Sequence, residues 1–222
     1  MNKINLFGEL DLEITDQSSI IGGVWREEGD YVLQDNELFR GIYLDIIQNP
    51  NPCVIDVGAN TGCIGLFNKN LNFPIYAFEP NKLAFQELLE NVWNNKCNTL
   101  CYNIAAGENP EKLSMTEYPT LWGYGFNRIS TEPTEYVVDV LPLDTVIPFN
   151  QIVTHVKIDV EGFELYVLRG MKRILEQRPT IYIEIIEPHF NRYGYSHTDI
   201  FDFLSGYGYD FYQLDENNYK FV

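Results

Sequence analysis

The sequence predicts an α/β fold built on a doubly wound, mostly parallel sheet of seven strands that ends in an antiparallel C-terminal hairpin. The first observation is a set of apolar runs typical of buried parallel strands, at 53–57, 74–79, 99–107, 154–160 and 180–186. The second is that helical patterns alternate with these runs, which favours a parallel sheet. The third is the stretch 209–222, which is typical of two strands joined at 215–218.

The chain has 222 residues, of which 45% are hydrophobic, and this length and composition fit a single domain. Residues 1–48 are expected to form an N-terminal cover segment with a hairpin and a helix over 36–47. Residues 49–222 form the main domain, with an aromatic insertion at about 108–150. Further helices are expected in four places: from about Gly62, over 81–95, over 164–177 and near 198–205.

The net charge of −17 argues against partners that carry dense negative charge. Binding to nucleic acid or to an anionic membrane surface needs clustered Lys and Arg. The sequence has no apolar run long enough to span a membrane, no signal-peptide pattern and no CxxC pair among its four cysteines. We therefore expect a cytoplasmic monomer or homodimer with reduced cysteines, which binds neither nucleic acid nor membrane.

The most specific local signal is VIDVGANTG at 54–62, where a strand ends at Asp56 and glycines follow at positions 58 and 62. Glycine lets the backbone approach a ligand closely, and the helix expected next offers free N–H groups. Glu79 ends the following strand, where an acid can accept both ribose hydroxyls of a bound adenosine. Together they predict an adenosyl ligand, against the alternative of a tight turn beside a solvated acid. The loop departs from the GxGxxG pattern of NAD enzymes.

Several blocks of sequence together resemble the FkbM-type S-adenosylmethionine-dependent methyltransferases. They are DVGANTG (56–62), AFEP (77–80), NIAAG (103–107), PLDTVI (142–147), VKIDVEGFELYVLRG (156–170) and RPTIYIEI (178–185). The similarity covers roughly residues 50–187, and DVGAN and KIDVEG are its specific parts. It implies a Rossmann-like class I methyltransferase fold, one S-adenosylmethionine per chain and O-methylation of a small-molecule or glycan acceptor, with sugars and glycosides first.

The resemblance also implies positions for the cofactor. The methionine moiety would be surrounded by the first loop, with residues Asp56, Gly58, Ala59, Asn60 and Gly62. The ribose would be held by Glu79, with Pro80 and Asn81 beside it, and the adenine would be bordered by Asn103, Ala105 and Ala106. The N-terminal region matches the family only loosely, although Tyr31, Glu37 or Arg40 could close over the methionine tail.

Charged residues near the ends of the fourth and fifth strands are candidates for catalysis. Lys157, Asp159 and Glu161 alternate, so on an extended strand they share one face, with Glu161 already turning into the loop. Glu184 lies near the end of the neighbouring strand and should converge with Asp159 beside the methyl group. Two carboxylates there suit Mg²⁺ or Mn²⁺. The alternative is a closed ion-pair network in which Lys157 neutralises both acids.

A sugar hydroxyl needs a general base, and His189 is the best placed of the three histidines, with Glu187 as an alternative. Four aromatic residues of the insertion could stack on an acceptor sugar, or could equally pack on the protein or on a second subunit; they are Tyr118, Trp122, Tyr124 and Phe126. Gly123 and Gly125 would let this segment move as a lid.

Three functions follow from these observations. The first is an S-adenosylmethionine-dependent O-methyltransferase that acts on a hydroxyl of a sugar or glycoside. The second is an NAD(P)-dependent Rossmann oxidoreductase, which fits Glu79 but lacks the third glycine of GxGxxG. The third is a non-catalytic adenosyl-binding module, because a sequence alone does not show turnover.

Overall fold

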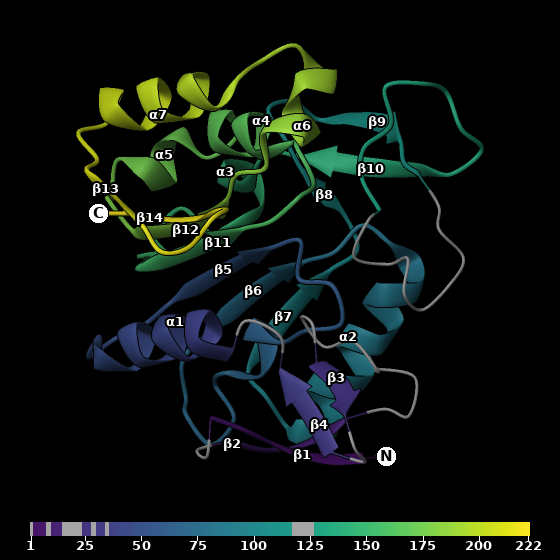
Figure 1. The fold of residues 1–222 in the computed structure, drawn as a ribbon, viewed down its shortest axis with the longest axis vertical. Coiled ribbons are helices and arrows are strands. Elements are labelled where there is room, and N and C mark those ends of the chain that lie inside the picture. Colours follow the sequence, from purple (N-terminus) through teal and green to yellow (C-terminus); the bar gives the residue numbers. More distant parts are fainter. Residues whose placement is uncertain (1, 8–9, 15–23, 28–29, 34–35, 117–126) are drawn as a thin grey trace.

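The structure is a computed structural model that describes residues 2–7, 10–14, 24–27, 30–33, 36–116 and 127–222. Its centre is the predicted seven-stranded sheet, in the order β13-β14-β12-β11-β5-β6-β7 (Figure 1). The strands are β5 (Val54–Val57), β6 (Ile75–Phe78), β7 (Thr99–Tyr102), β11 (His155–Ile158), β12 (Thr180–Glu184), β13 (Phe211–Gln213) and β14 (Asn218–Phe221). β14 runs antiparallel to both of its neighbours, β12 and β13, and the other pairs of this sheet are parallel. The predicted fold class and the C-terminal hairpin are therefore confirmed.

Helices cover both faces of the sheet, as the alternating pattern predicts (Figure 1). One face carries α1 (Asn36–Gln48) and α2 (Lys82–Asn95), and the other carries α4 (Glu164–Arg169), α5 (Lys172–Leu175) and α7 (His197–Gly206). Each layer has its own hydrophobic cluster, because strand residues alternate between the two faces. Among the helices that the structure describes, none combines the length and apolar character needed to cross a membrane.

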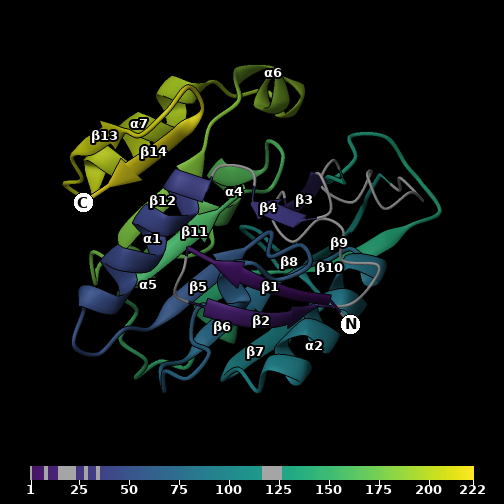
Figure 2. The ribbon, with the colours of Figure 1, turned by 60° about the horizontal axis from the view of Figure 1, so that its bottom comes forward.

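The N-terminal segment contributes two hairpins in addition to α1. They are β1 (Asn2–Leu6) with β2 (Leu10–Ile14), and β3 (Val24–Glu27) with β4 (Asp30–Leu33). Figure 2 shows the first hairpin on the α2 side of the main sheet. Asn95 joins it to α2, since its side-chain amide exchanges two hydrogen bonds of 2.8 and 2.7 Å with the backbone of Glu13. The division at residue 48 into cover and main domain stays a prediction.

The strand predicted over 99–107 is wrong in its second half. β7 ends at Tyr102, and the chain then leaves the main sheet to form β8 (Ala105–Ala106). β8 pairs with β10 (Val137–Leu141), which also pairs with β9 (Glu111–Ser114), so β8 and two strands of the predicted insertion build a second, three-stranded sheet. Asn103 marks the break.

Two predicted helices also differ from the structure. The helix expected from Gly62 is only a short 3-10 turn, η1 (Ile64–Leu66). The helix expected over 164–177 is divided into α4 and α5 at Gly170, where a Cβ would lie 2.0 Å from the backbone oxygen of Gly107. After β12, the chain forms two further short turns, α6 (Glu187–Phe190) and η3 (Asn191–Tyr193), before α7.

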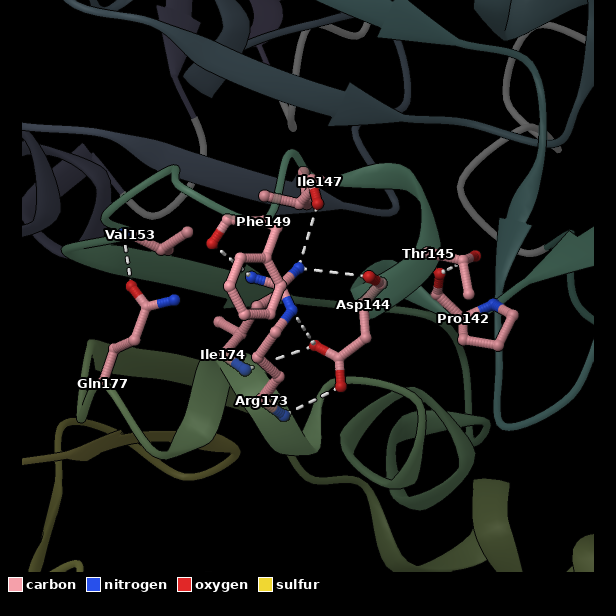
Figure 3. Close-up of polar contacts among 9 residues, drawn as sticks. All are labelled: Pro142, Asp144, Thr145, Ile147, Phe149, Val153, Arg173, Ile174 and Gln177. Carbon is pink, nitrogen blue, oxygen red and sulfur yellow. Dashed lines mark hydrogen bonds and ion pairs between the residues drawn. The ribbon is translucent and has the colours of Figure 1, made fainter.

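Asp144, in α3 (Leu143–Val146), fixes the start of α5 (Figure 3). Its carboxylate accepts the backbone N–H of Arg173 at 2.8 Å and that of Ile174 at 3.2 Å. In return, the Arg173 guanidinium donates to the backbone oxygens of Asp144 and Ile147, at 3.1 and 2.9 Å. These bonds satisfy N–H groups that a helix start otherwise leaves free, so the link joins the end of the insertion to the helical layer.

Candidate active site

The loop after β5 turns sharply at two glycines with positive φ, +80° at Gly58 and +102° at Gly62. A Cβ on Gly58 would lie 1.7 Å from the backbone oxygen of Asp159, and one on Gly62 would lie 2.6 Å from Leu88 Cδ1. The glycines are therefore required by close contacts within the protein itself. The N–H groups of Gly58 and Ala59 both donate to one carbonyl of β6 at 3.0 Å, which fixes the loop beside the next strand.

Glu79, directly after β6, faces this loop and is almost fully buried. Its two carboxylate oxygens accept the backbone N–H groups of Asn60, at 2.8 Å, and Asn81, at 2.7 Å. Burial nevertheless dominates and raises the pKa of Glu79 to about 7. The buried Oδ1 of Asn60 has no hydrogen-bond partner among the described residues. Glu79 and Asn60 thus offer acceptor oxygens at one place.

The residues predicted beside Glu79 also stabilise the local structure. The Asn81 side chain caps α2 by accepting the N–H groups of Leu83 and Ala84, both at 3.0 Å. Asn103 donates to the backbone oxygens of Glu79 and Pro80, at 2.9 and 3.1 Å. The amide of Asn103 therefore joins the ends of β6 and β7.

Ala105 and Ala106 are buried in two hydrophobic clusters, one on each side of β8. Asn103 is exposed, so it is the member of the predicted adenine-binding trio that solvent reaches. The structure thus brings together Glu79 and the loop after β5, the residues predicted to bind the ribose and the methionine moiety. The adenine-binding roles of the two alanines stay predictions.

Five charged residues, from β5, from β11 and the turn after it, and from β12, meet beside the loop. Lys157 lies opposite Asp56 in the register of β11 and β5, so their side chains share the sheet face that carries α1. Lys157 Nζ donates to Asp159 Oδ2 at 2.7 Å. One carboxylate oxygen each of Asp159, Glu161 and Glu184 lie within 4.8 Å of one another. The expected convergence of Asp159 and Glu184 is present, and Glu161 joins them.

Electrostatics couples the members of this cluster. Burial raises the pKa of Asp56 to about 7, with the Lys157 charge acting in the opposite direction. Burial opposes the charge of Lys157, but the carboxylates of Asp159 and Asp56 raise its pKa above the ordinary value. Burial and the Asp159 charge also raise the pKa of Glu184. The cluster therefore retains a lysine cation and holds protons that isolated carboxylates would release.

His189, in α6, lies against Glu161, with 3.0 Å between His189 Nδ1 and Glu161 Oε2. Burial raises the pKa of Glu161 to about 8, with the Asp159 charge second, and burial lowers the pKa of His189. Glu161 has a φ of +58° and Gly162 one of +107°. A Cβ on Gly162 would lie 2.5 Å from the backbone oxygen of His189, so the glycine permits this close approach.

The sequence matches the Methyltransferase FkbM domain over residues 56–211, a range that begins at Asp56 and includes the loop, Glu79 and the charged cluster. The matched part is well over half of the 222 residues.

The chain belongs to the FkbM methyltransferase family.

A curated relative is the hexuronic acid methyltransferase AglP of Haloferax volcanii, 29% identical over 135 residues. The match covers 59% of this FkbM chain and 54% of that protein, so it spans about half of the relative's length. The family is one of methyltransferases, so membership favours methyl transfer over hydride transfer. The NAD(P)-dependent alternative is therefore set aside.

Solved structures share the fold of the FkbM chain at low sequence identity. The tRNA (uracil-54, C5)-methyltransferase of Pyrococcus abyssi, in complex with S-adenosyl-L-homocysteine, has a TM-score of 0.52 at 13% identity, over 100% of this chain and 44% of that chain. SMU.1697c of Streptococcus mutans, in complex with SAH, has a TM-score of 0.50 at 12% identity, over 86% and 97%. These likenesses confirm the predicted class I methyltransferase fold.

The sequence interpretation assigned Glu161 to the turn and did not include it or Glu164 among the site residues of this FkbM methyltransferase. Glu164 is buried and accepts the Gly162 N–H at 2.9 Å and the Tyr195 hydroxyl at 3.1 Å. It thus fixes the turn that presents Glu161. The signal in the sequence that could have indicated both residues is the EGFE stretch at 161–164, which has an acid on each side of a glycine. The predicted acceptor-binding residues Tyr118, Trp122, Tyr124 and Phe126 lie outside the described residues.

Proposed function

We propose that this FkbM protein is an S-adenosylmethionine-dependent O-methyltransferase that methylates a hydroxyl group of a sugar or glycoside. The observation that carries the proposal is the paired His189 and Glu161, 3.0 Å apart, next to the carboxylates of Asp159 and Glu184. This group lies at the carboxyl ends of β11 and β12, where doubly wound sheets bind ligands. The curated relative named for hexuronic acid supports a sugar as the acceptor.

The cofactor site is supported by Glu79 and the loop after β5. Two backbone N–H groups fix the Glu79 carboxylate and occupy only one lone pair on each oxygen. The remaining lone pairs are available to the two ribose hydroxyls. The cofactor carries a positive sulfonium and an amino group, which suit a site bordered by Asp56 and Asp159.

The cofactor supplies an activated methyl group, so the protein has to position the acceptor and remove its proton. In the proposed step the acceptor oxygen bonds to the methyl carbon as the carbon–sulfur bond breaks, and sulfur keeps the electron pair. When Glu161 is ionised it accepts the N–H on Nδ1 of His189, which leaves Nε2 as a base for the acceptor proton. Glu161 acts as a positioning residue in this scheme.

The three carboxylates of Asp159, Glu161 and Glu184 also fit Mg²⁺ or Mn²⁺, which prefer oxygen ligands. A cation held there would lower the pKa of the acceptor hydroxyl. The alternative is the ion-pair network, in which Lys157 and bound protons balance the charge. Assays with and without EDTA separate the two: loss of turnover that Mg²⁺ or Mn²⁺ restores supports a metal, and unchanged turnover supports the network.

The proposal is tested by a methyl-transfer screen over monosaccharides and glycosides. Substitution His189→Gln is expected to lower kcat by about 10²–10⁴-fold, as loss of a general base does, without changing the affinity for S-adenosylmethionine. His197→Gln is the matched control, because His197 also pairs with a glutamate, Glu187 at 3.2 Å, on the protein surface. Binding of the cofactor without transfer to any sugar would contradict the proposal and favour the non-catalytic adenosyl-binding module.

A further inference from the structure

A groove of about 670 Å³ lies between α1 and the C-terminal hairpin, on the same sheet face as Lys157. This volume is within the range of about 300–1,000 Å³ that is common for small-molecule sites. We call it the α1 groove. Its walls come from α1, from Tyr182 of β12, and from the turn and second strand of the hairpin; they include Leu38, Gly41, Asp45, Leu214, Asp215 and Lys220.

β12 links the α1 groove to the charged cluster. Tyr182 and Glu184 are two residues apart on this strand, so their side chains lie on one face, with Glu184 at the carboxyl end. Glu184 pairs with Asn218 of β14. Asn218 in turn donates from its backbone and its side chain to Asp215, at 2.9 and 3.0 Å. The rim at Asp215 is thus connected to Glu184 through one residue.

Polar groups in the α1 groove give it a net negative charge. Three carboxylates line it, from Glu37, Asp45 and Asp215, and Lys220 is its one cation among the lining residues. Lys220 Nζ is already paired with Asp45 Oδ2 at 2.9 Å. Although burial opposes ionisation, hydrogen bonds from Tyr182 and Lys220 lower the pKa of Asp45. An incoming anion would find no unpaired cation on these walls and would be repelled.

Apart from Gln48 and Tyr182, the other residues that line the α1 groove are apolar. They include Leu38, Ile42 and Leu44 of α1 and Leu214 of the hairpin turn. Such walls favour a ligand with apolar faces, and the Tyr182 hydroxyl, which is bonded to Asp45, is occupied. The groove therefore combines apolar walls with a rim of hydrogen-bond acceptors.

We propose that the α1 groove binds a non-anionic, amphipathic group attached to the sugar that is methylated. This inference rests on the proposed function and adds that the acceptor extends beyond the reacting ring. The group would be an aglycone or a second sugar, whose hydroxyl or amine hydrogens meet the carboxylate rim while an apolar face meets the leucines. A carboxylate or phosphate on this group would weaken binding.

Gly41 provides a way to fill the α1 groove. It lines the groove in the middle of α1, and a Cβ placed on it meets no atom within 4 Å. Substitution Gly41→Phe therefore places a ring in the groove, and replacing a helical glycine favours the helix. Gly206 of α7 is the matched control, because it is also helical and has no atom within 4 Å of its added Cβ.

The test measures dissociation constants of glycosides by ligand-observed NMR, with S-adenosylhomocysteine present. We expect phenyl β-glucoside or methyl β-cellobioside to bind at least tenfold more tightly than methyl β-glucoside. If only the phenyl compound binds more tightly than methyl β-glucoside, the group in the groove is an aglycone. If only the cellobioside does, the group is a second sugar. The tighter binding should disappear when the ligand is 4-carboxyphenyl β-glucoside. It should also disappear in the variant Gly41→Phe and remain in the variant Gly206→Phe.

Equal affinities for all these glycosides, or a gain that survives Gly41→Phe or the added carboxylate, would overturn the inference. Circular dichroism of both variants confirms that each is folded before binding is compared. The measurement does not depend on turnover. Discrimination among the glycosides without methyl transfer would therefore refute the proposed function and leave the α1 groove as a binding site.

Discussion

Glu79 is a single residue whose charge should control cofactor affinity. Its pKa is raised to about 7 by burial, and the ribose hydroxyls need the ionised carboxylate as acceptor. The ionised fraction falls as the pH drops through this pKa, so binding should weaken by about tenfold between pH 8 and pH 6. Calorimetric titration with S-adenosylmethionine at several pH values measures this slope.

The variant Glu79→Gln separates this carboxyl from the other titrating groups of the site. Loss of charge-assisted hydrogen bonds, each contributing about 1.5–3 kcal/mol, should weaken binding at pH 8 by at least about tenfold. The pH dependence that remains should be smaller than in the wild type, because it comes only from other groups such as Asp56. Unchanged affinity in the variant would show that the ribose is bound elsewhere.

At the level of elements, the carboxylate of Asp144 determines where α5 starts. Asp144→Ala removes both acceptors of the Arg173 and Ile174 N–H groups and should lower the free energy of unfolding by about 1–2 kcal/mol. The control is Asp139→Ala, which breaks the exposed ion pair with Lys112 and should cost at most about 1 kcal/mol. Urea denaturation compares the two. Equal losses would mean that the Asp144 cap adds nothing beyond an ordinary surface charge.

Element boundaries show where local sequence was informative. The apolar strands were predicted closely because burial on both faces leaves a continuous apolar run. The prediction of one continuous helix over 164–177 was wrong. The helix is divided at Gly170, which lies against the backbone of Gly107, a residue far away in sequence. The prediction of one strand over 99–107 was wrong because Ala105 and Ala106 pair with β10 instead of continuing in the main sheet. The local sequence does not indicate this pairing partner.

At the level of the whole molecule, the mostly parallel sheet and the convergence of Asp159 with Glu184 were expected, because the carboxyl ends of neighbouring parallel strands lie at one edge of the sheet. The contact of Glu161 with His189 was not, since it depends on two consecutive residues with positive φ and on how α6 returns over the turn. The α1 groove also depends on packing between α1 and the hairpin, segments at opposite ends of the chain.

The central claim is that a methyl group is transferred to a hydroxyl oxygen of a sugar. The most direct measurement uses S-adenosylmethionine labelled with ¹³C in the methyl group and follows the product by NMR with the best acceptor of the glycoside screen. We expect a new methoxy carbon coupled to a sugar ring position, formed by the wild-type protein and by His197→Gln and nearly lost in His189→Gln. A labelled methyl on nitrogen or carbon, or no transfer by folded protein that binds the cofactor, would contradict it.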